Sequence, residues 1–188
     1  MNALKRPIVF IHGFGGGSYE YQPISRFLQE QGLAPCYEFS YTEKIGQVSL
    51  KKIAWQLNAF LQTLPDHEFD IVALSQGGII ARLAIAYLIG KKIRTCVTVC
   101  TPHHGSLLAY VGFLPGIREL RPGSPLFHEL DSSRATYYAV WNPLDMMVIP
   151  GSSAKFEHAQ ENKKVVALLH PLTFSHPETI KFLKIGKA

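Results

Sequence analysis

An apolar run, a serine among small residues and a second apolar run follow one another without a spacer in residues 69–89. Residues 71–74 suit a short parallel strand that is buried on both faces. Gly77 and Gly78 supply bare backbone where this strand and the helix after it must nearly touch. The second apolar run predicts a mostly buried helix that ends at Gly90. A strand that turns directly into a helix in this way is typical of an α/β fold.

Ser75 lies at the corner between this strand and this helix, so its hydroxyl is expected at the carboxyl end of the sheet. The local sequence is Ala73-Leu74-Ser75-Gln76-Gly77. It is close to the G-x-S-x-G nucleophile elbow, with alanine in the first position. That position needs a small side chain, which alanine provides. A serine in an ordinary strand-to-helix turn is the alternative, and partners for the serine must decide between the two.

The composition fits a single domain that spans residues 1–188. The chain is 47% hydrophobic and 18% charged, so it has enough apolar content for a sizeable core. No apolar run reaches about 18 residues, so no membrane-spanning helix is expected. The sequence starts without a charged and then apolar leader. We therefore expect a cytoplasmic protein, or a secreted one whose signal peptide has been removed.

The net charge is +5, and the lysines and arginines are scattered along the chain. No basic stripe with interleaved aromatic residues is present, so nucleic acid is not expected as a partner. A solvated basic surface is the simpler interpretation, and transient contact with anionic lipid surfaces is the alternative. No obligate protein partner is evident. The cysteines at 36, 96 and 100 predict neither a disulfide framework nor a metal site, so no cofactor is expected.

Runs that suit strands alternate with runs that suit helices along the whole chain. The expected strands cover residues 7–11, 35–41, 71–74, 92–100, 135–141 and 163–169. The alternation predicts about six mostly parallel strands with helices on both faces of the sheet. A small cap-like insert is expected around residues 106–134. It contains a short helix for which Ser124 is the N-cap and Pro125 the first helical residue.

A glycine-rich loop, HGFGGGS at residues 12–18, follows the first predicted strand. A loop that binds a dinucleotide is one interpretation, but the glycines do not fit G-x-G-x-x-G. A loop that turns backbone N–H groups toward an oxyanion fits better, because glycine lets the chain approach closely. A flexible connection is the remaining alternative. His12 is expected to brace this loop rather than to take part in chemistry.

A serine nucleophile needs a base, and the base needs an acid that orients it. In elbow enzymes the acid and then the histidine follow the serine in the chain. Asp145 is the acidic residue that lies just past the carboxyl end of a predicted strand, although a turn-forming role is the alternative. His170 directly follows the last predicted strand. It is therefore favoured over His176 as the base.

The run at residues 107–116 is apolar and broken by glycine and proline. It follows the fourth predicted strand at the sheet end that holds Ser75. Because its apolar side chains need cover, Phe113 and Leu114 are expected to line an acyl pocket. A surface loop that pads the core is the alternative. The neighbouring His103 and His104 are expected to be structural or pocket-lining residues rather than metal ligands.

Together, and in this order, these motifs resemble the α/β-hydrolase superfamily and, more narrowly, small bacterial triacylglycerol lipases and esterases. The resemblance rests on HGFGG at 12–16, ALSQGG at 73–78, TPHHGS at 101–106, Asp145 and His170. It implies a carboxylester hydrolase with no metal in the mechanism. It also implies that the N–H groups of Phe14 and Gln76 bind the oxyanion.

Two N-terminal strands of the full superfamily sheet are missing, which leaves a minimal sheet of order 2-1-3-4-5-6 with its pocket between strands 1 and 3. We expect Ser75, Asp145 and His170 to hydrolyse small-molecule or lipid esters through an acyl-enzyme intermediate. A thioesterase or acyltransferase with the same triad is the first alternative. A non-enzymatic binding protein on the same fold is the second.

Overall fold

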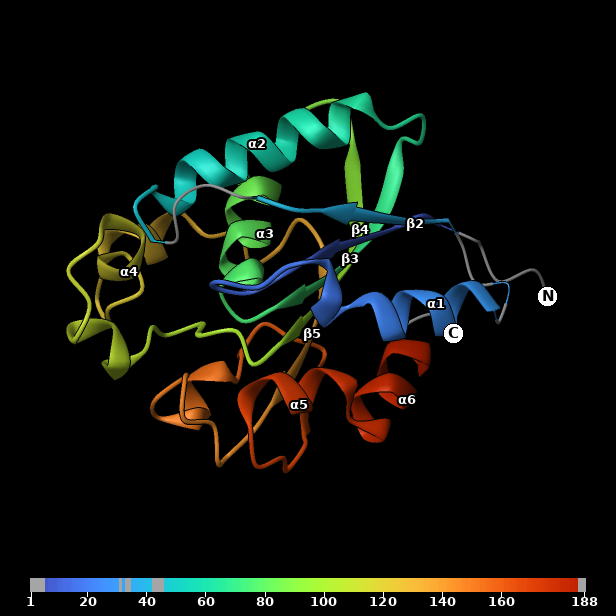
Figure 1. Cartoon of the computed structure of the whole chain (residues 1–188). Helices are drawn as coiled ribbons and strands as arrows, with labels where there is room; N and C mark the ends of the chain where they lie inside the picture. Colours follow the sequence, from blue (N-terminus) through green and yellow to red (C-terminus); the bar gives the residue numbers. More distant parts are fainter. Residues whose placement is uncertain (1–5, 31, 33–34, 42–45, 186–188) are drawn as a thin grey trace.

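The computed structural model describes residues 6–30, 32, 35–41 and 46–185. Six strands in these residues form one sheet in which every neighbouring pair is parallel (Figure 1). The strands are β1 (Ile8–Ile11), β2 (Cys36–Phe39), β3 (Glu68–Leu74), β4 (Lys92–Val99), β5 (Thr136–Trp141) and β6 (Glu161–Lys164). Their order is β2-β1-β3-β4-β5-β6, which confirms the predicted minimal sheet.

Helices cover both faces of this sheet (Figure 1). The α-helices are α1 (Gln22–Glu30), α2 (Leu50–Thr63), α3 (Gln76–Tyr87), α4 (Pro115–Arg118), α5 (His170–Ser175) and α6 (Pro177–Ile185). Short 3-10 helices are η1 (Ser18–Glu20), η2 (Leu107–Tyr110), η3 (Pro125–Glu129) and η4 (Gly151–Ala154). None of the helices in the described part of the chain has both the length and the apolar character needed to cross a bilayer.

The alternation of side chains along β1 explains why the core has two halves. Val9 and Ile11 pack with residues of α2 and α3 on one face of the sheet. Ile8 and Phe10 pack with residues of α1 and α6 on the other face. Successive side chains of a strand point to opposite faces. A parallel sheet covered on both sides therefore needs apolar residues at every position, as β1 has.

The predicted strand at residues 163–169 is wrong in its position, because β6 is Glu161–Lys164. β6 is an edge strand, and edge strands are commonly charged, so its polar sequence hid it. The chain then leaves the sheet. Beyond β6 the chain is held by the side-chain amide of Asn142, which donates a hydrogen bond to the carbonyl of Ala167 at 2.8 Å. His170 consequently begins α5 and does not directly follow a strand.

The predicted fourth strand is one residue too long, because β4 ends at Val99 and Cys100 has a φ of 49°. The segment predicted as an insert, 106–134, contains η2, α4 and η3 between β4 and β5. The predicted short helix at its end is confirmed in 3-10 form. The Ser124 side chain accepts a hydrogen bond from the N–H of Leu126, and Pro125 is the first helical residue.

Candidate active site

Ser75 occupies the turn between β3 and α3 in a strained conformation. Its φ is 53° and its ψ is −126°, and its N–H donates to the carbonyl of Val99 at 2.8 Å. A sparsely populated backbone conformation of this kind costs a non-glycine residue about 1–3 kcal/mol. Ser75 is the N-cap residue of α3, yet its hydroxyl makes no capping hydrogen bond. The turn therefore leaves the Ser75 hydroxyl available at the sheet end.

The two glycines after this serine are required by close packing, as predicted. A Cβ atom on Gly77 would lie 2.5 Å from the carbonyl oxygen of His12 and 2.8 Å from that of Ile11. A Cβ atom on Gly78 would collide with the side chain of Thr101. Helix α3 can therefore start against β1 and the end of β4 only with bare backbone at these two positions.

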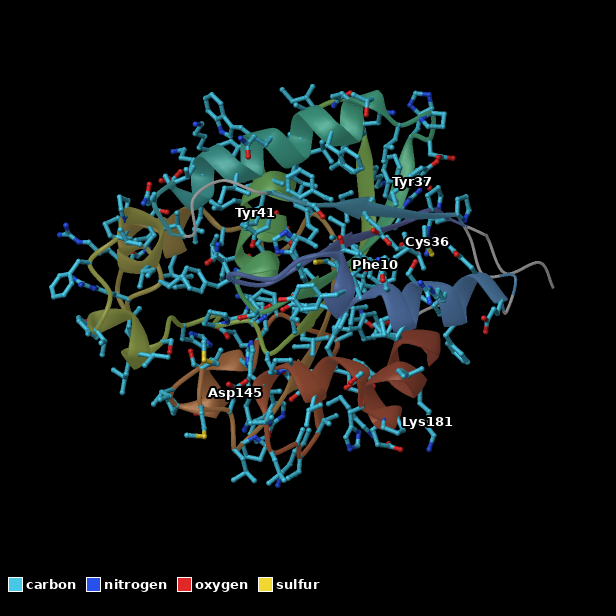
Figure 2. The ribbon with its side chains drawn as sticks, in the orientation of Figure 1. Phe10, Cys36, Tyr37, Tyr41, Asp145 and Lys181 are labelled. Atoms are coloured by element: carbon cyan, nitrogen blue, oxygen red, sulfur yellow. The ribbon has the colours of Figure 1, made fainter. Side chains whose placement is uncertain are left out.

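Asp145 and His170 are in direct contact. The Nδ1–H of His170 donates to Oδ2 of Asp145 at 2.7 Å, since a carboxylate can only accept. The Asp145 side chain is 0% exposed and that of His170 is 9% exposed. Figure 2 shows Asp145 in the loop after β5, near the start of α5. With its proton on Nδ1, the neutral imidazole presents Nε2 as a proton acceptor.

The loop after Asp145 holds its second carboxylate oxygen. Oδ1 accepts from the N–H groups of Met147 at 2.8 Å and Val148 at 3.0 Å. Burial opposes the negative charge. The hydrogen bond and charge of His170, followed by the two N–H groups, outweigh burial and lower the pKa of Asp145. The carboxylate is therefore ionised and fixed in direction.

The side chain of Asn142 connects the loop after β5 with the start of α5. The sequence does not reveal this role of Asn142. Its buried side-chain amide donates to Ala167 and, at 3.2 Å, to the hydroxyl of Thr173. Its carbonyl oxygen accepts from the N–H of Leu144 at 3.0 Å. The signal in the sequence was an Asn-Pro pair just after a strand. Such a pair indicates a turn, but it does not indicate a hydrogen bond to a segment 25 residues further along the chain.

The loop after β1 is braced by side chains from other elements. The Nδ1–H of His12 donates to the carbonyl of Gly13 at 2.8 Å, and its Nε2 accepts from the N–H of Tyr41. The Tyr41 hydroxyl donates to the carbonyls of His12 and Gly13, at 3.1 Å each. Glu20 accepts from the Gly13 N–H at 3.0 Å. His12 therefore braces this loop, as predicted, while the contributions of Tyr41 and Glu20 were missed.

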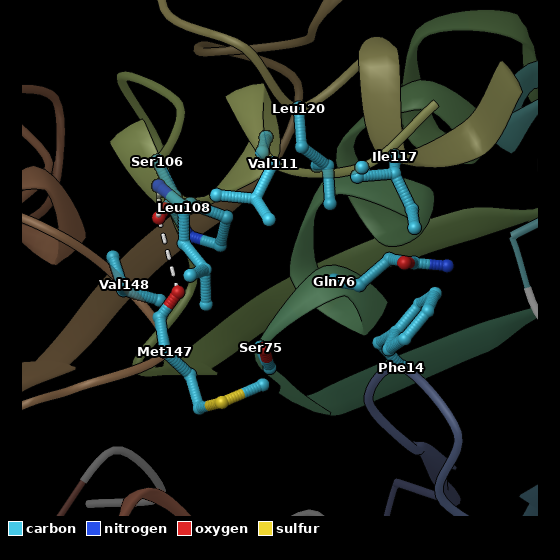
Figure 3. Close-up of a pocket in the computed structure, with 13 residues that line it drawn as sticks. Phe14, Ser75, Gln76, Ser106, Leu108, Val111, Ile117, Leu120, Met147 and Val148 are labelled. Carbon is cyan, nitrogen blue, oxygen red and sulfur yellow. Dashed lines mark hydrogen bonds between the residues drawn. The ribbon is translucent and has the colours of Figure 1, made fainter. Parts of the chain in front are cut away.

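The N–H groups predicted to form an oxyanion hole belong to Phe14, in the loop after β1, and to Gln76. Gln76 is the first residue of α3, so its N–H has no acceptor within the helix. No hydrogen bond among the described residues uses the N–H of Phe14. Both residues line the same pocket as Ser75 (Figure 3). The positive end of the α3 dipole adds to the attraction of this corner for negative charge.

An apolar pocket of about 250 Å³ opens above Ser75. Figure 3 shows Ser75 between Met147 on one side and Gln76 and Phe14 on the other. The remaining walls come from the loop after β5 and from the insert, and they include Leu108, Val111, Ile117, Leu120 and Val148. An apolar cavity lined by Ser75 and by the two residues predicted to donate to an oxyanion suits a substrate with an apolar chain and a carbonyl group.

The predicted lining of this pocket by Phe113 and Leu114 is wrong. Phe113 is 85% exposed, and Leu114 packs over Gly46, where an added Cβ would lie 3.2 Å from it. The lining residues of the insert include Leu108 and Val111 instead. Residues three apart lie on one side of a 3-10 turn, and η2 turns these two toward Ser75. The chain has turned outward by residue 113, before α4 starts at Pro115.

His103 has a structural role in the described part of the chain. It is buried between Arg82, whose Nη1 lies 3.1 Å from Nδ1, and Thr98, whose hydroxyl lies 3.0 Å from Nε2. Burial, followed by the charge of Arg82, lowers the pKa of His103 well below its ordinary value. His104 is exposed and pairs with Glu157 at 3.1 Å. Neither histidine lines the pocket.

Within residues 6–30, 32, 35–41 and 46–185, the structure brings together one cluster of possible metal ligands that the sequence does not suggest. The ligand atoms of Cys100, Asp145 and His170 lie within 4.8 Å of one another. Zn²⁺ accepts these donor types. Asp145 and His170 are nevertheless already bonded to each other, and burial raises the pKa of the Cys100 thiol well above its ordinary value. Two of the three side chains of this cluster are therefore engaged with each other, and the third keeps its proton.

Comparison with known families gives a match over more than half of the chain. The sequence model of a family described as palmitoyl protein thioesterase matches residues 7–108. This segment contains Ser75, Phe14 and Gln76, but it ends before Asp145 and His170. No curated protein sequence matches the chain.

Many solved structures share the fold. The ydeN gene product of B. subtilis has a TM-score of 0.74 at 17% identity, covering 96% of this chain and 98% of that one. A monoacylglycerol lipase from Paleococcus ferrophilus has a TM-score of 0.68 at 17% identity, with coverages of 95% and 91%. Mature lipase BlEst2 of Bacillus licheniformis has a TM-score of 0.67 at 15% identity, with coverages of 100% and 94%. The predicted superfamily is confirmed, and the protein is a hydrolase of the α/β class. By its match over residues 7–108, the chain belongs to the palmitoyl protein thioesterase family.

Proposed function

We propose that this protein is a serine carboxylester hydrolase in which Ser75, His170 and Asp145 are the nucleophile, the base and the acid. The observation that carries the proposal is the 2.7 Å hydrogen bond between His170 and Asp145. A buried carboxylate that orients a histidine, at the sheet end that also bears a strained serine, is the arrangement that activates a hydroxyl.

In the first half of the reaction, Nε2 of His170 takes the hydroxyl proton of Ser75 while Oγ attacks the ester carbonyl. Asp145 stabilises the imidazolium that forms. His170 then gives this proton to the alcohol oxygen as the carbon–oxygen bond breaks, and the acyl group stays on Ser75. In the second half, water replaces Ser75 as the attacking group, and the acid is released with the serine restored.

The tetrahedral intermediate carries a negative oxygen, which needs donors that are already in place. In this proposal the N–H groups of Phe14 and Gln76 provide them. Removing one donor of this kind costs roughly 3 kcal/mol of transition-state stabilisation. The bracing of the loop by His12 and Tyr41 supports the proposal, because it fixes Phe14 relative to Ser75 before substrate binds.

The pocket supports an acyl group of short to medium length. Its volume of about 250 Å³ is just below the ~300–1,000 Å³ of common small-molecule sites. A longer acyl chain would extend beyond the pocket across exposed apolar side chains. Leu107, Phe113 and Met146 are exposed and are chain neighbours of lining residues. Their exposure supports transient contact with lipid surfaces, from which a long-chain ester would enter.

The test is hydrolysis of a 4-nitrophenyl ester series together with labelling by a serine-directed phosphonate. Wild-type protein should turn over the esters and gain one phosphonyl group on Ser75. Ser75→Ala should lose both properties and keep its thermal unfolding transition. Ser152→Ala is the matched control, since Ser152 is exposed in η4, and it should behave as wild type. Activity or labelling of Ser75→Ala above a tenth of wild type would refute the proposal. So would a wild type that neither reacts nor labels, which would favour a binding protein.

A thioester substrate is the second candidate, and the family match over residues 7–108 favours it. The same residues would serve, because a thioester carbonyl is attacked in the same way and a thiolate leaves more readily than an alkoxide. Matched oxygen and sulfur esters of one acyl chain separate the two candidates by their kcat/KM ratio. Added alcohols reveal an acyltransferase, since acyl product would then pass to the alcohol instead of water.

A further inference from the structure

Cys100 has an unusual backbone conformation next to the candidate site. It is fully buried directly after β4, and its φ of 49° lies in the left-handed region that favours glycine. Its N–H donates to the carbonyl of Val140 at 2.8 Å, so the backbone there is firmly held. A glycine could adopt this turn without strain. The strain therefore points to a use for the side chain.

The Cys100 thiol faces the carboxylate that holds His170. Its sulfur and the ligand atoms of Asp145 and His170 lie within 4.8 Å of one another. The groups that act on the pKa of this thiol include the Asp145 carboxylate, the Thr173 hydroxyl and the backbone of Asn142. Burial, and then Asp145, raise the pKa of the Cys100 thiol. The sulfur thus keeps its proton and has a hydrogen to donate.

The groups around Cys100 are arranged as a chain of donors toward the carboxylate. The Asn142 amide donates to the Thr173 hydroxyl at 3.2 Å. Thr173 lowers the pKa of the Cys100 thiol, as a donor to sulfur does, whereas Asp145 raises this pKa, as an acceptor from the thiol does. Such chains strengthen each member by polarisation. Met147, Val148 and His170 supply the three other donors to Asp145. A carboxylate has about four acceptor sites, so the thiol completes the set.

We propose that Cys100 is a positioning residue whose thiol donates the fourth hydrogen bond to Asp145 and thereby fixes the direction and the basicity of this carboxylate toward His170. The proposal rests on the proposed function, because its kinetic effect requires Asp145 and His170 to form the base for Ser75. Without the thiol, Asp145 would bear more unshared negative charge. It would stabilise a protonated His170 more strongly and orient the ring less well.

Three substitutions separate the thiol from the strain. Cys100→Ala removes the thiol and keeps the strained residue, Cys100→Gly removes both, and Cys100→Ser keeps a donor of similar shape. Cys96→Ala is the matched control, because Cys96 is also buried but lies within β4. Glycine fits this φ without strain and serine is nearly isosteric, so folded variants are available even if alanine destabilises the chain.

The kinetic readout is the pH profile of 4-nitrophenyl butyrate hydrolysis. The Cys100→Ala and Cys100→Gly variants should have a kcat about three- to ten-fold lower than that of the wild type and a nearly unchanged KM. They should also move the acid limb of kcat/KM upward by about 0.3–0.6 pH unit, because a hydrogen bond to the charged form of Asp145 is lost. The Cys100→Ser variant and the Cys96→Ala control should both keep the acid limb of the wild-type kcat/KM profile.

A second readout needs no turnover. The far-downfield proton resonance of the His170 Nδ1–H should shift in the alanine and glycine variants, also in a Ser75→Ala background. The proposal would be overturned if the acid limb of kcat/KM and the His170 Nδ1–H resonance were both unchanged in Cys100→Ala and Cys100→Gly. It would also be overturned if they changed in Cys100→Ala but not in Cys100→Gly, because the effect would then come from backbone strain. If Ser75→Ala instead retained activity, the proposed function would fail, while the resonance would still test the contact between Cys100 and Asp145.

Discussion

The hydroxyl of Thr101 donates a hydrogen bond of 2.9 Å to the main-chain carbonyl of Ser75. Thr101 directly follows the strained Cys100, and its side chain fills the space that Gly78 leaves open. The turn after β4 thus supports the backbone of the candidate nucleophile, while the Cys100 sulfur lies within 4.8 Å of the ligand atoms of Asp145 and His170. One turn thereby connects Ser75 with the acid of the proposed triad.

Replacing Thr101 by valine tests this support. The shape is nearly kept, but a buried hydrogen bond to Ser75 is lost. We expect the free energy of unfolding to fall by about 1–2 kcal/mol. The value of kcat should fall as well, since the turn at Ser75 would be less firmly held, and KM should change little. Urea unfolding and ester kinetics measure these effects. A valine variant with wild-type kcat would show that the turn at Ser75 needs no support from Thr101.

The choice between two histidines is tested by paired alanine variants. His170→Ala should lower kcat at least about 10⁴-fold, because members of a triad act as a unit. His176→Ala should retain most of the activity. The Nδ1 of His176 accepts from the N–H of Glu178 at 3.2 Å, which is a local role at the start of α6. The measurement is the steady-state rate of each variant with one soluble ester. If His176→Ala lost activity and His170→Ala retained it, His170 would not be the base.

The lowered pKa of Asp145 predicts how stability depends on acid. At a pH below the ordinary aspartate range, the unfolded chain binds a proton at this residue more readily than the folded chain. The stabilisation from ionised Asp145 is therefore complete above that range, and it is lost as the pH falls through the lower pKa of the folded state. Asp145→Asn should flatten the loss of stability between about pH 4 and pH 2. Urea unfolding across this range measures it, with Asp66→Asn as a control. Equal slopes in wild type and Asp145→Asn would contradict the prediction.

Contact with lipid surfaces is tested on one exposed residue beside the pocket. Phe113→Ser should weaken binding to vesicles of mixed neutral and anionic lipids about tenfold, because an apolar side chain worth roughly 1.5–3 kcal/mol is removed. Hydrolysis of a soluble short-chain ester should not change. Ile89→Ser is the matched control, since Ile89 is 83% exposed but lies past the far end of α3 from Ser75. Equal losses in the two variants, measured by co-sedimentation, would argue against an apolar contact face beside the pocket.

The sequence alone determined the fold and the corner that bears Ser75. The apolar run of β3, the small residues around the serine and the buried length of α3 are local signals. They were readable because a parallel sheet covered on both faces demands apolar residues in nearly every position. The alternation of strands and helices predicts a parallel sheet, and the order of its strands follows from the family resemblance.

Other features depended on contacts between segments far apart in the chain. The sequence predicts that His170 directly follows the last strand, but His170 starts α5, and the Asn142 amide holds the segment before it by a hydrogen bond to Ala167. The insert carries Leu108 and Val111 into the pocket and turns Phe113 outward, because a 3-10 turn groups residues three apart. The side chain of Cys100 meets Asp145 only because a left-handed turn ends β4, and cysteine gives no local signal for such a turn. Local sequence sets the periodicity and burial of each element, whereas the direction of each loop side chain is decided by the packing of the whole chain.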